Sequence, residues 1–177
     1  MPASMPTDLG NNQPARHAGD DTLALCALAS GSRGNAIYLA AGRNALLIDA
    51  GLSGREIETR LRRQNLDPHD LKAILVTHEH SDHASGVAAL AHKYAIPVFA
   101  SYGTLKAVGP GLVGKAFDSH SDFRIGAVSV HPIIVPHDAR EPTQFVFEHR
   151  DVRIGVLSDL GQVTPADVLH RLLRVAQ

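Results

Sequence analysis

Histidine and aspartate residues are concentrated in one short segment of the chain, HEHSDH at positions 78–83. Imidazole nitrogens and carboxylate oxygens together suit zinc best, and manganese or iron can occupy similar sets of ligands. In an extended backbone alternate side chains share a side, which places His78, His80 and Asp82 together. His83 then faces the other way, so one short segment can serve two adjacent ions. The alternative interpretation is a polar strand-to-helix turn whose histidines bind nothing.

Three further candidates stand where predicted strands end. Asp49 ends an apolar strand before a glycine, so its carboxylate can orient a ligand histidine without touching the metal. A turn or helix-capping role is the alternative for Asp49. His137 follows an apolar run and is our third ligand for a first ion, and His120 and His131 are weaker alternatives. Asp159 ends a later strand, from where it can reach into a cleft or serve as an ordinary turn residue.

Hydrophobic periodicity predicts the elements that position these side chains. The expected strands cover residues 23–29, 36–40, 45–49, 73–77, 97–100, 125–135 with an interruption at Pro132, 143–149 and 152–157. The expected helices cover residues 54–65, about 84–94, 102–108 and a final helix from Thr164. The alternation of strands and helices in the first half predicts an α/β fold with a mixed sheet covered by helices.

The segment ASGSRGN, at positions 29–35, allows two interpretations. Its two glycines permit a tight turn, so the segment can be a simple connection between strands. Alternatively, its backbone amides and Arg33 face an anionic substrate. The residues favour the connection over the anion site.

The composition is that of an ordinary globular domain. The chain has 177 residues, 44% of them hydrophobic, and its 17 basic and 18 acidic side chains nearly cancel. This balance gives no electrostatic reason for tight nonspecific binding to nucleic acid. We expect a flexible tail over residues 1–21, one domain over residues 22–177, no membrane span and a cytoplasmic location. Cys26, the single cysteine, is expected to be a reduced and buried thiol.

The order of several motifs resembles a known family. HEHSDH matches the His-x-His-x-Asp-His signature of the metallo-β-lactamase fold. ASGSRGN, LLIDAGLSGREIETRL, ILVTHEHSDHASGV, VPHDAREP and SDLGQVTP occur in the order found in its YycJ/WalJ-type, exonuclease-like group. The resemblance implies an αββα sandwich and a two-zinc site. It further implies that a metal-activated water cleaves DNA phosphodiester bonds.

The resemblance also assigns roles to individual residues. His78, His80 and His137 hold one ion in this scheme. Asp82 and His83 help to hold the second ion, Asp159 bridges the two, and Asp82 is the catalytic residue. The ligands are the set His78, His80, Asp82, His83, His137 and Asp159.

The resemblance fails at the carboxyl end of the sequence. Members of this family continue past the position of Gln177 with more strands and a histidine that completes the second metal site. We therefore expect an incomplete domain, truncated at its C-terminus, for which His170 in the predicted final helix is a weak substitute ligand. Three hypotheses follow: a DNA phosphodiesterase, a hydrolase of a small cyclic phosphodiester, thioester or lactam, and an inactive fragment with an incomplete metal site.

Overall fold

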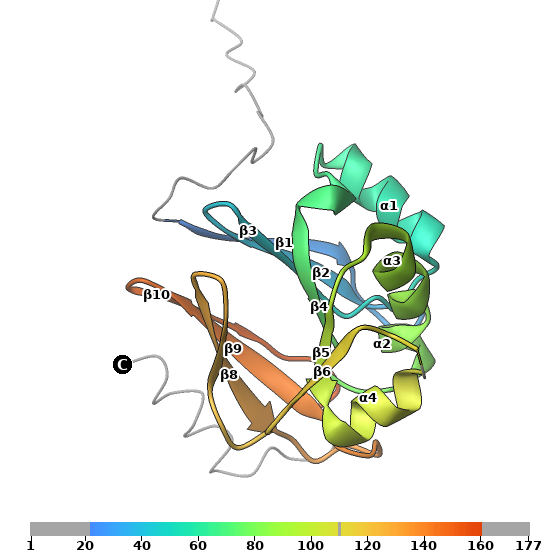
Figure 1. The fold of residues 1–177 in the computed structure, drawn as a ribbon, viewed down its shortest axis with the longest axis vertical. Coiled ribbons are helices and arrows are strands. Elements are labelled where there is room, and N and C mark those ends of the chain that lie inside the picture. Colours follow the sequence, from blue (N-terminus) through green and yellow to red (C-terminus); the bar gives the residue numbers. More distant parts are fainter. Residues whose placement is uncertain (1–21, 110, 161–177) are drawn as a thin grey trace, which may run out of the picture.

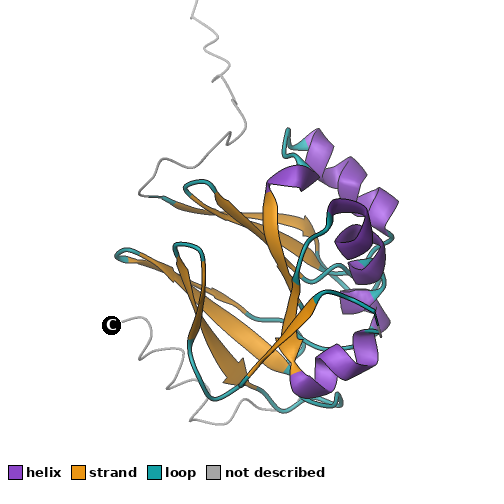
Figure 2. Cartoon of the chain, in the orientation of Figure 1, coloured by secondary structure: helices purple, strands orange, loops and turns teal. Residues whose placement is uncertain are grey.

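The computed structural model describes residues 22–109 and 111–160. The predicted tail over residues 1–21 and the predicted final helix with His170 lie outside the described residues. Two β-sheets face each other, and the helices cover the outer face of one of them (Figure 1). The view coloured by secondary structure shows this order of helices, first sheet and second sheet (Figure 2). No helix of the described residues is long and apolar enough to cross a membrane.

The first sheet is mixed, as its sequence predicted. Its six strands, in the order β1-β2-β3-β4-β5-β6, are Leu23–Ala29, Ala36–Ala41, Asn44–Ile48, Leu71–Leu75, Val98–Ser101 and Gly114–Phe117. The pairs β1–β2 and β2–β3 are antiparallel, whereas β3, β4, β5 and β6 run parallel to one another. Because parallel strands end at the same edge of a sheet, the segments that follow β3, β4 and β5 gather there. Asp49 and the histidine segment are among them.

The helices bury their apolar sides on this sheet. They are α1 (Gly54–Arg63), the 3-10 helix η1 (Pro68–Asp70), α2 (Ser81–Ala84), α3 (Val87–Tyr94) and α4 (Tyr102–Val108). Ser53 caps α1 by accepting a hydrogen bond from the Glu56 N–H, and Ile57 and Leu61 are fully buried. The helix predicted from about residue 84 is interrupted at Gly86, whose N–H donates to the Ala50 carbonyl. That bond ties the end of the histidine segment to the end of β3.

The second sheet is antiparallel, with the order β10-β9-β8-β7. Its strands are β7 (Phe123–Ile125), β8 (Val128–Ile134), β9 (Thr143–His149) and β10 (Val152–Val156). Leu46, Ile48 and Leu75 from the first sheet and Phe145 and Phe147 from the second belong to one buried cluster. This apolar layer holds the two sheets together, and therefore fixes the strand ends that carry the candidate ligands.

The strand predicted over residues 125–135 is divided at the turn of Gly126 and Ala127 into β7 and β8, and not at Pro132 as the sequence suggested. Pro132 lies within β8 and is paired with Phe145 of β9. β7 pairs with β8 only as far as Val130, so no described strand covers the other side of β8 at the proline. A proline nitrogen, which cannot donate a hydrogen bond, is tolerated at such an uncovered edge.

Candidate metal centre

The histidine segment starts after β4 and enters helix α2 at Ser81. The segment is therefore extended only as far as His80. Asp82 and His83 lie on the helical turn of α2, whereas the sequence predicted an extended backbone throughout. The side chains of His78 and His83 are fully buried. Asp82 keeps 29% of its side chain exposed, and His80 is partly exposed.

Three imidazoles converge at this edge of the sheet. His78 and His80 come from the segment after β4, and His137 comes from the loop after β8 in the second sheet. The ring centroid of His78 is 4.6 Å from that of His80 and 4.7 Å from that of His137. One nitrogen from each ring lies within 4.8 Å of the other two, and His80 Nδ1 is 3.3 Å from His137 Nε2. Residues far apart in the sequence thus offer three nitrogen ligands to one point.

A second group adjoins the first and shares His78 with it. Asp159, which follows β10, places its Oδ2 atom 2.6 Å from His83 Nε2 and 3.8 Å from His78 Nε2. Asp82 Oδ2 is 3.5 Å from the same His83 nitrogen. A carboxylate that lies between two imidazoles in this way can be shared by two neighbouring cations.

Buried hydrogen bonds fix the rings of His83 and His78. Asp49 Oδ2 accepts from His83 Nδ1 at 2.7 Å, so the lone pair of the ring lies on Nε2, the candidate ligand atom. Asp49 also accepts from the Thr77 backbone N–H at 2.8 Å and from the Thr77 hydroxyl at 2.9 Å. Because that hydroxyl has given its hydrogen to Asp49, it accepts from His78 Nδ1 at 3.0 Å. A single carboxylate thus orients one histidine directly and a second through Thr77.

The pKa values of the two buried histidines move in opposite directions. Burial, followed by the neighbouring positive charges of the other imidazoles, lowers the pKa of His78 to about 4, so its ring is neutral at pH 7. Burial also acts to lower the pKa of His83, but the hydrogen bond and charge of Asp49 outweigh it and raise this pKa. Desolvation raises the pKa of Asp49, opposed by its bonds to His83 and Thr77. Asp49 thus keeps a hydrogen on His83 Nδ1.

These residues fit a divalent cation. His78 Nε2 is buried and has no hydrogen-bond partner, although an unpaired buried nitrogen is costly. Its neutral ring directs that lone pair towards the nitrogens of His80 and His137 and the carboxylate of Asp159. A buried lone pair that faces two further imidazole nitrogens and a carboxylate is an arrangement that a metal ion satisfies.

Asn35 belongs to the site, although its sequence context pointed only to a turn. Its Nδ2 atom is 3.0 Å from His83 Nε2, and its backbone N–H donates to the Asp82 carbonyl at 2.7 Å. The Gly31 N–H donates to Asn35 Oδ1 at 3.0 Å, which sets the orientation of the amide group. The signal in the sequence was the asparagine at the end of a glycine-rich loop, which alone does not reveal a partner 48 residues away.

Glu141 anchors the loop that carries His137, and sequence reasoning missed it as well. Its Oε2 atom accepts from the Gly103 N–H at 2.9 Å, and its Oε1 atom accepts from the Ser119 hydroxyl at 2.8 Å. Its carbonyl accepts from the Ser101 hydroxyl at 2.9 Å. These bonds join the loop after β8 to the end of β5 and thereby hold His137 in front of the histidine segment.

The weaker histidine candidates lie elsewhere. His131 pairs with Asp122 at 2.9 Å and with Glu148 at 3.4 Å on the second sheet. His120 follows a turn in which its N–H donates to Asp118. Neither belongs to a described group of residues that could hold a metal.

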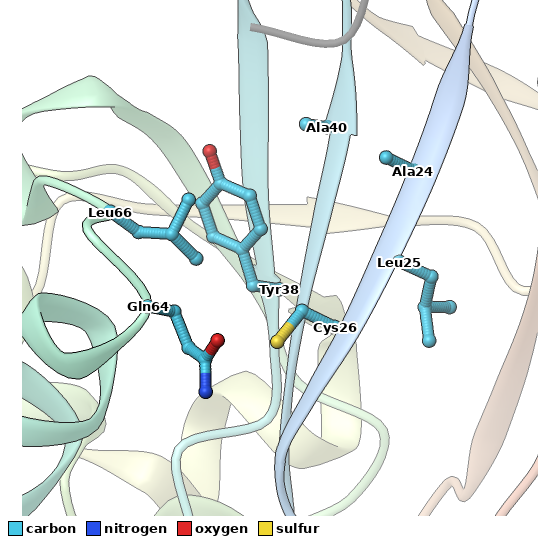
Figure 3. A pocket seen from close by; sticks show the side chains of 7 residues that line it. All are labelled: Ala24, Leu25, Cys26, Tyr38, Ala40, Gln64 and Leu66. Atoms are coloured by element: carbon cyan, nitrogen blue, oxygen red, sulfur yellow. The ribbon is translucent and has the colours of Figure 1, made fainter. Parts of the chain in front are cut away.

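A separate cavity of about 90 Å³ lies beside β1 and β2 (Figure 3). Cys26, Tyr38, Gln64 and Leu66 are among the residues that line it, and none of the candidate metal ligands does. Cys26 is partly rather than fully buried, unlike the sequence expectation, and burial raises the pKa of its thiol. A thiol with a raised pKa is a poor nucleophile, so the cavity offers no catalytic group comparable to the histidine cluster.

The profile of the metallo-beta-lactamase superfamily matches residues 29–170 of this chain. The exodeoxyribonuclease YycJ of Bacillus anthracis is 38% identical over 143 residues, which cover 77% of this chain and 54% of that protein. The exodeoxyribonuclease WalJ of Streptococcus pneumoniae is 39% identical over 145 residues, with the same two coverages. This chain therefore spans about half the length of these relatives.

Other proteins match a shorter part of this chain, or share its fold at low sequence identity. The hydroxyacylglutathione hydrolase of Tolumonas auensis is 50% identical over 62 residues, 35% of this chain and 22% of that enzyme. Among solved structures, the metallo-beta-lactamase SMB-1 has a TM-score of 0.66 at 17% identity and covers 93% of this chain and 74% of its own. A metallo-beta-lactamase of Cronobacter sakazakii has a TM-score of 0.63 at 20% identity, with coverages of 78% and 60%. At these identities the structures establish a common fold.

Proposed function

The chain belongs to the metallo-beta-lactamase superfamily, and from this membership we propose that it is a metal-dependent hydrolase that cleaves DNA phosphodiester bonds from strand ends. The observation that carries the proposal is the convergence of the two ligand groups, which share His78 and come from both sheets. The names of the relatives YycJ and WalJ, both exodeoxyribonucleases, support DNA as the substrate.

We assign the two ligand groups to two neighbouring cations, with zinc as the first choice. His78, His80 and His137 would hold the first, because each offers a nitrogen to a common point. Asp82 and His83 would hold the second, and Asp159 would be shared between them. Divalent cations in such positions make water more acidic and withdraw negative charge from a phosphodiester under attack.

The chain's own residues supply orientation and proton transfer in this proposal. Asp49 and Thr77 hold His83 and His78 by their Nδ1 atoms, so both Nε2 atoms face the ligand groups before a substrate arrives. Asp82 is the catalytic residue, since its partly exposed carboxylate beside His83 can orient the attacking water and accept its proton. Glu141 keeps His137 in place from the second sheet.

A small-molecule substrate is the second candidate function. The hydroxyacylglutathione hydrolases of Tolumonas auensis and Nitrosomonas europaea match 62 and 55 residues of this chain, and these names favour a thioester. A chain that binds one metal or none, and turns over no substrate, is the remaining alternative. The three candidates differ in metal content and in substrate, so the same set of assays separates them.

The test is a substrate panel with zinc or manganese added. We expect nucleotides to be released from the ends of linear DNA, and little hydrolysis of hydroxyacylglutathione or of a lactam. Asp82→Ala and His80→Ala should abolish this activity, whereas His92→Ala is the matched control because His92 is an exposed residue of α3. Full activity in the first two variants, or hydrolysis of the thioester alone, would refute the proposal.

A further inference from the structure

The loop between β1 and β2 lines a polar cavity of about 350 Å³ that the proposed mechanism does not use. The loop residues from Ser30 to Gly34 form one wall, and Leu52 and Arg60 complete it. None of the proposed metal ligands lines this cavity.

Five hydrogen-bond donors in the loop have no partner among the described residues. This holds for the hydroxyls of Ser30 and Ser32, the backbone N–H groups of Ser32 and Arg33, and the Arg33 guanidinium. All three residues are exposed. Neighbouring backbone N–H groups on a tight turn form concave sites for anions, and arginine adds a fixed charge and a fork of donors that fits phosphate oxygens.

Arg33 gives the cavity its net positive charge. Arg60, on the opposite wall, donates from Nη1 to the Leu28 carbonyl at 2.7 Å. Its Nε atom donates to the Glu56 carboxylate at 2.9 Å, so Glu56 balances the charge of Arg60. Arg33 has no such acidic partner among the described residues, and its charge is therefore available to a ligand.

The loop is held in one shape although its tip is exposed. The Gly34 N–H donates to the Gly31 carbonyl at 3.0 Å, and the Gly31 N–H donates to Asn35. Gly34 has a φ of 150°, and a Cβ atom there would lie 2.7 Å from the Gly51 carbonyl oxygen. The turn thus depends on glycine at this position. A site that is already shaped loses less entropy when it binds its ligand.

The same loop leads directly to the metal centre. Asn35, the residue after Gly34, touches His83 through its amide and Asp82 through its backbone N–H. A nucleic acid strand whose scissile phosphodiester lies at His83 can therefore place a neighbouring phosphate at this loop. The charge of Arg33 and the place of the loop directly before Asn35 suit a phosphate near the one that is cleaved.

We infer that the Ser30–Gly34 loop binds a backbone phosphate of the nucleic acid strand held at the metal centre. This inference rests on the proposed function, because it takes DNA as the substrate. Ser30, Ser32 and the backbone N–H groups would donate to the phosphate oxygens, and Arg33 would neutralise their charge.

The experiment compares Arg33→Ala with wild type, and Arg43→Ala is the matched control. Arg43 is an exposed arginine in the turn at the other end of β2. Binding of a fluorescent, phosphorothioate-linked single strand is measured by anisotropy at several salt concentrations. We expect Arg33→Ala to weaken binding about five- to tenfold near 0.1 M salt, and to reduce the slope of log K against log salt by about 0.7, the value for one lost contact. Arg43→Ala should change neither quantity.

Hydrolysis of bis(p-nitrophenyl) phosphate by the metal-loaded protein separates this inference from the proposed function. That small diester has no neighbouring phosphate, so Arg33→Ala should hydrolyse it like wild type. Equal strand binding by Arg33→Ala and Arg43→Ala would overturn the loop site, even if hydrolysis continues. Absent hydrolysis together with Arg33-dependent strand binding would overturn the proposed function and leave the loop site standing. Inorganic phosphate that competes as well as the strand would show a site for free phosphate instead.

Discussion

Replacing Asp49 by asparagine is the sharpest perturbation of how the proposed ligands are held. The carboxylate is 3% exposed and accepts hydrogen bonds from His83 Nδ1 and from both donors of Thr77. Asparagine has nearly the same shape but only one accepting oxygen, and its NH₂ group can only donate. If the oxygen stays with the Thr77 N–H, the NH₂ group faces His83 Nδ1. The His83 ring then carries its hydrogen on Nε2, the atom required by the metal.

The expected loss of metal affinity follows from the hydrogen bond between His83 and Asp49, which Asp49→Asn removes. A buried hydrogen bond to a charged group contributes about 1.5–3 kcal/mol, and the His83–Asp49 distance of 2.7 Å is that of a strong one. Since about 1.4 kcal/mol corresponds to a factor of ten, Asp49→Asn should weaken metal binding at the His83 position about 10- to 100-fold. Thr77→Val removes only the hydroxyl that accepts from His78. It should weaken zinc binding at the position of His78, His80 and His137 by a smaller factor.

Zinc affinity is measured by competition with a chromophoric chelator after the protein has been stripped with EDTA. Asp67→Asn is the matched control, because Asp67 caps η1 at the surface and does not contact the cluster. Thermal unfolding in EDTA distinguishes a change in ligand orientation from a general loss of stability. If Asp49→Asn binds zinc as tightly as Asp67→Asn while remaining folded, the orienting role of Asp49 is wrong.

Two other substitutions test separate parts of the structure. The Asn35 amide donates to the Gly31 and Asp82 carbonyls, so Asn35→Ala should loosen the turn that carries Asp82 and His83. In the same zinc competition it should weaken the His83 position about three- to tenfold and leave the position of His78, His80 and His137 unchanged, with Asn44→Ala as control. Equal weakening of both positions would contradict this role. Glu58→Gln removes the ion pair that joins α1 to α3 through Lys93, and should lower the melting temperature at pH 7. The Lys93 bond lowers the pKa of Glu58, so the difference from wild type should persist above about pH 4.3 and vanish as the pH falls through the lowered pKa. A difference that does not change with pH would refute that explanation.

Local patterns were sufficient for most of the first sheet. The apolar runs that precede Asp49 and His78 predicted β3 and β4, and the glycine-rich loop predicted the connection between β1 and β2. β6 was not predicted, because its residues Gly114–Phe117 are mostly exposed and carry no apolar alternation. Its position depends on pairing with β5, which is a property of the folded sheet. The continuity of β8 through Pro132 likewise depends on where β7 ends.

The part of the candidate site that could be predicted is the set of ligands that lie close together in the sequence. Three histidines and an aspartate within six positions indicated a metal without any knowledge of the fold. The structure places His137 and Asp159 beside them, as the family resemblance implied, while their roles as ligands remain a proposal. Asn35 and Glu141 could not be identified in advance, because each acts through contacts that form only when distant segments meet.

Metal content per chain tests the central claim most directly, and inductively coupled plasma mass spectrometry of protein dialysed against zinc measures it. We expect about two ions per chain in wild type and a clear reduction in His78→Ala, because both ligand groups include that residue. His92→Ala, which alters an exposed histidine outside the cluster, should retain the wild-type content. A wild-type content near zero, or an unchanged content in His78→Ala, would contradict a metal centre built on these residues.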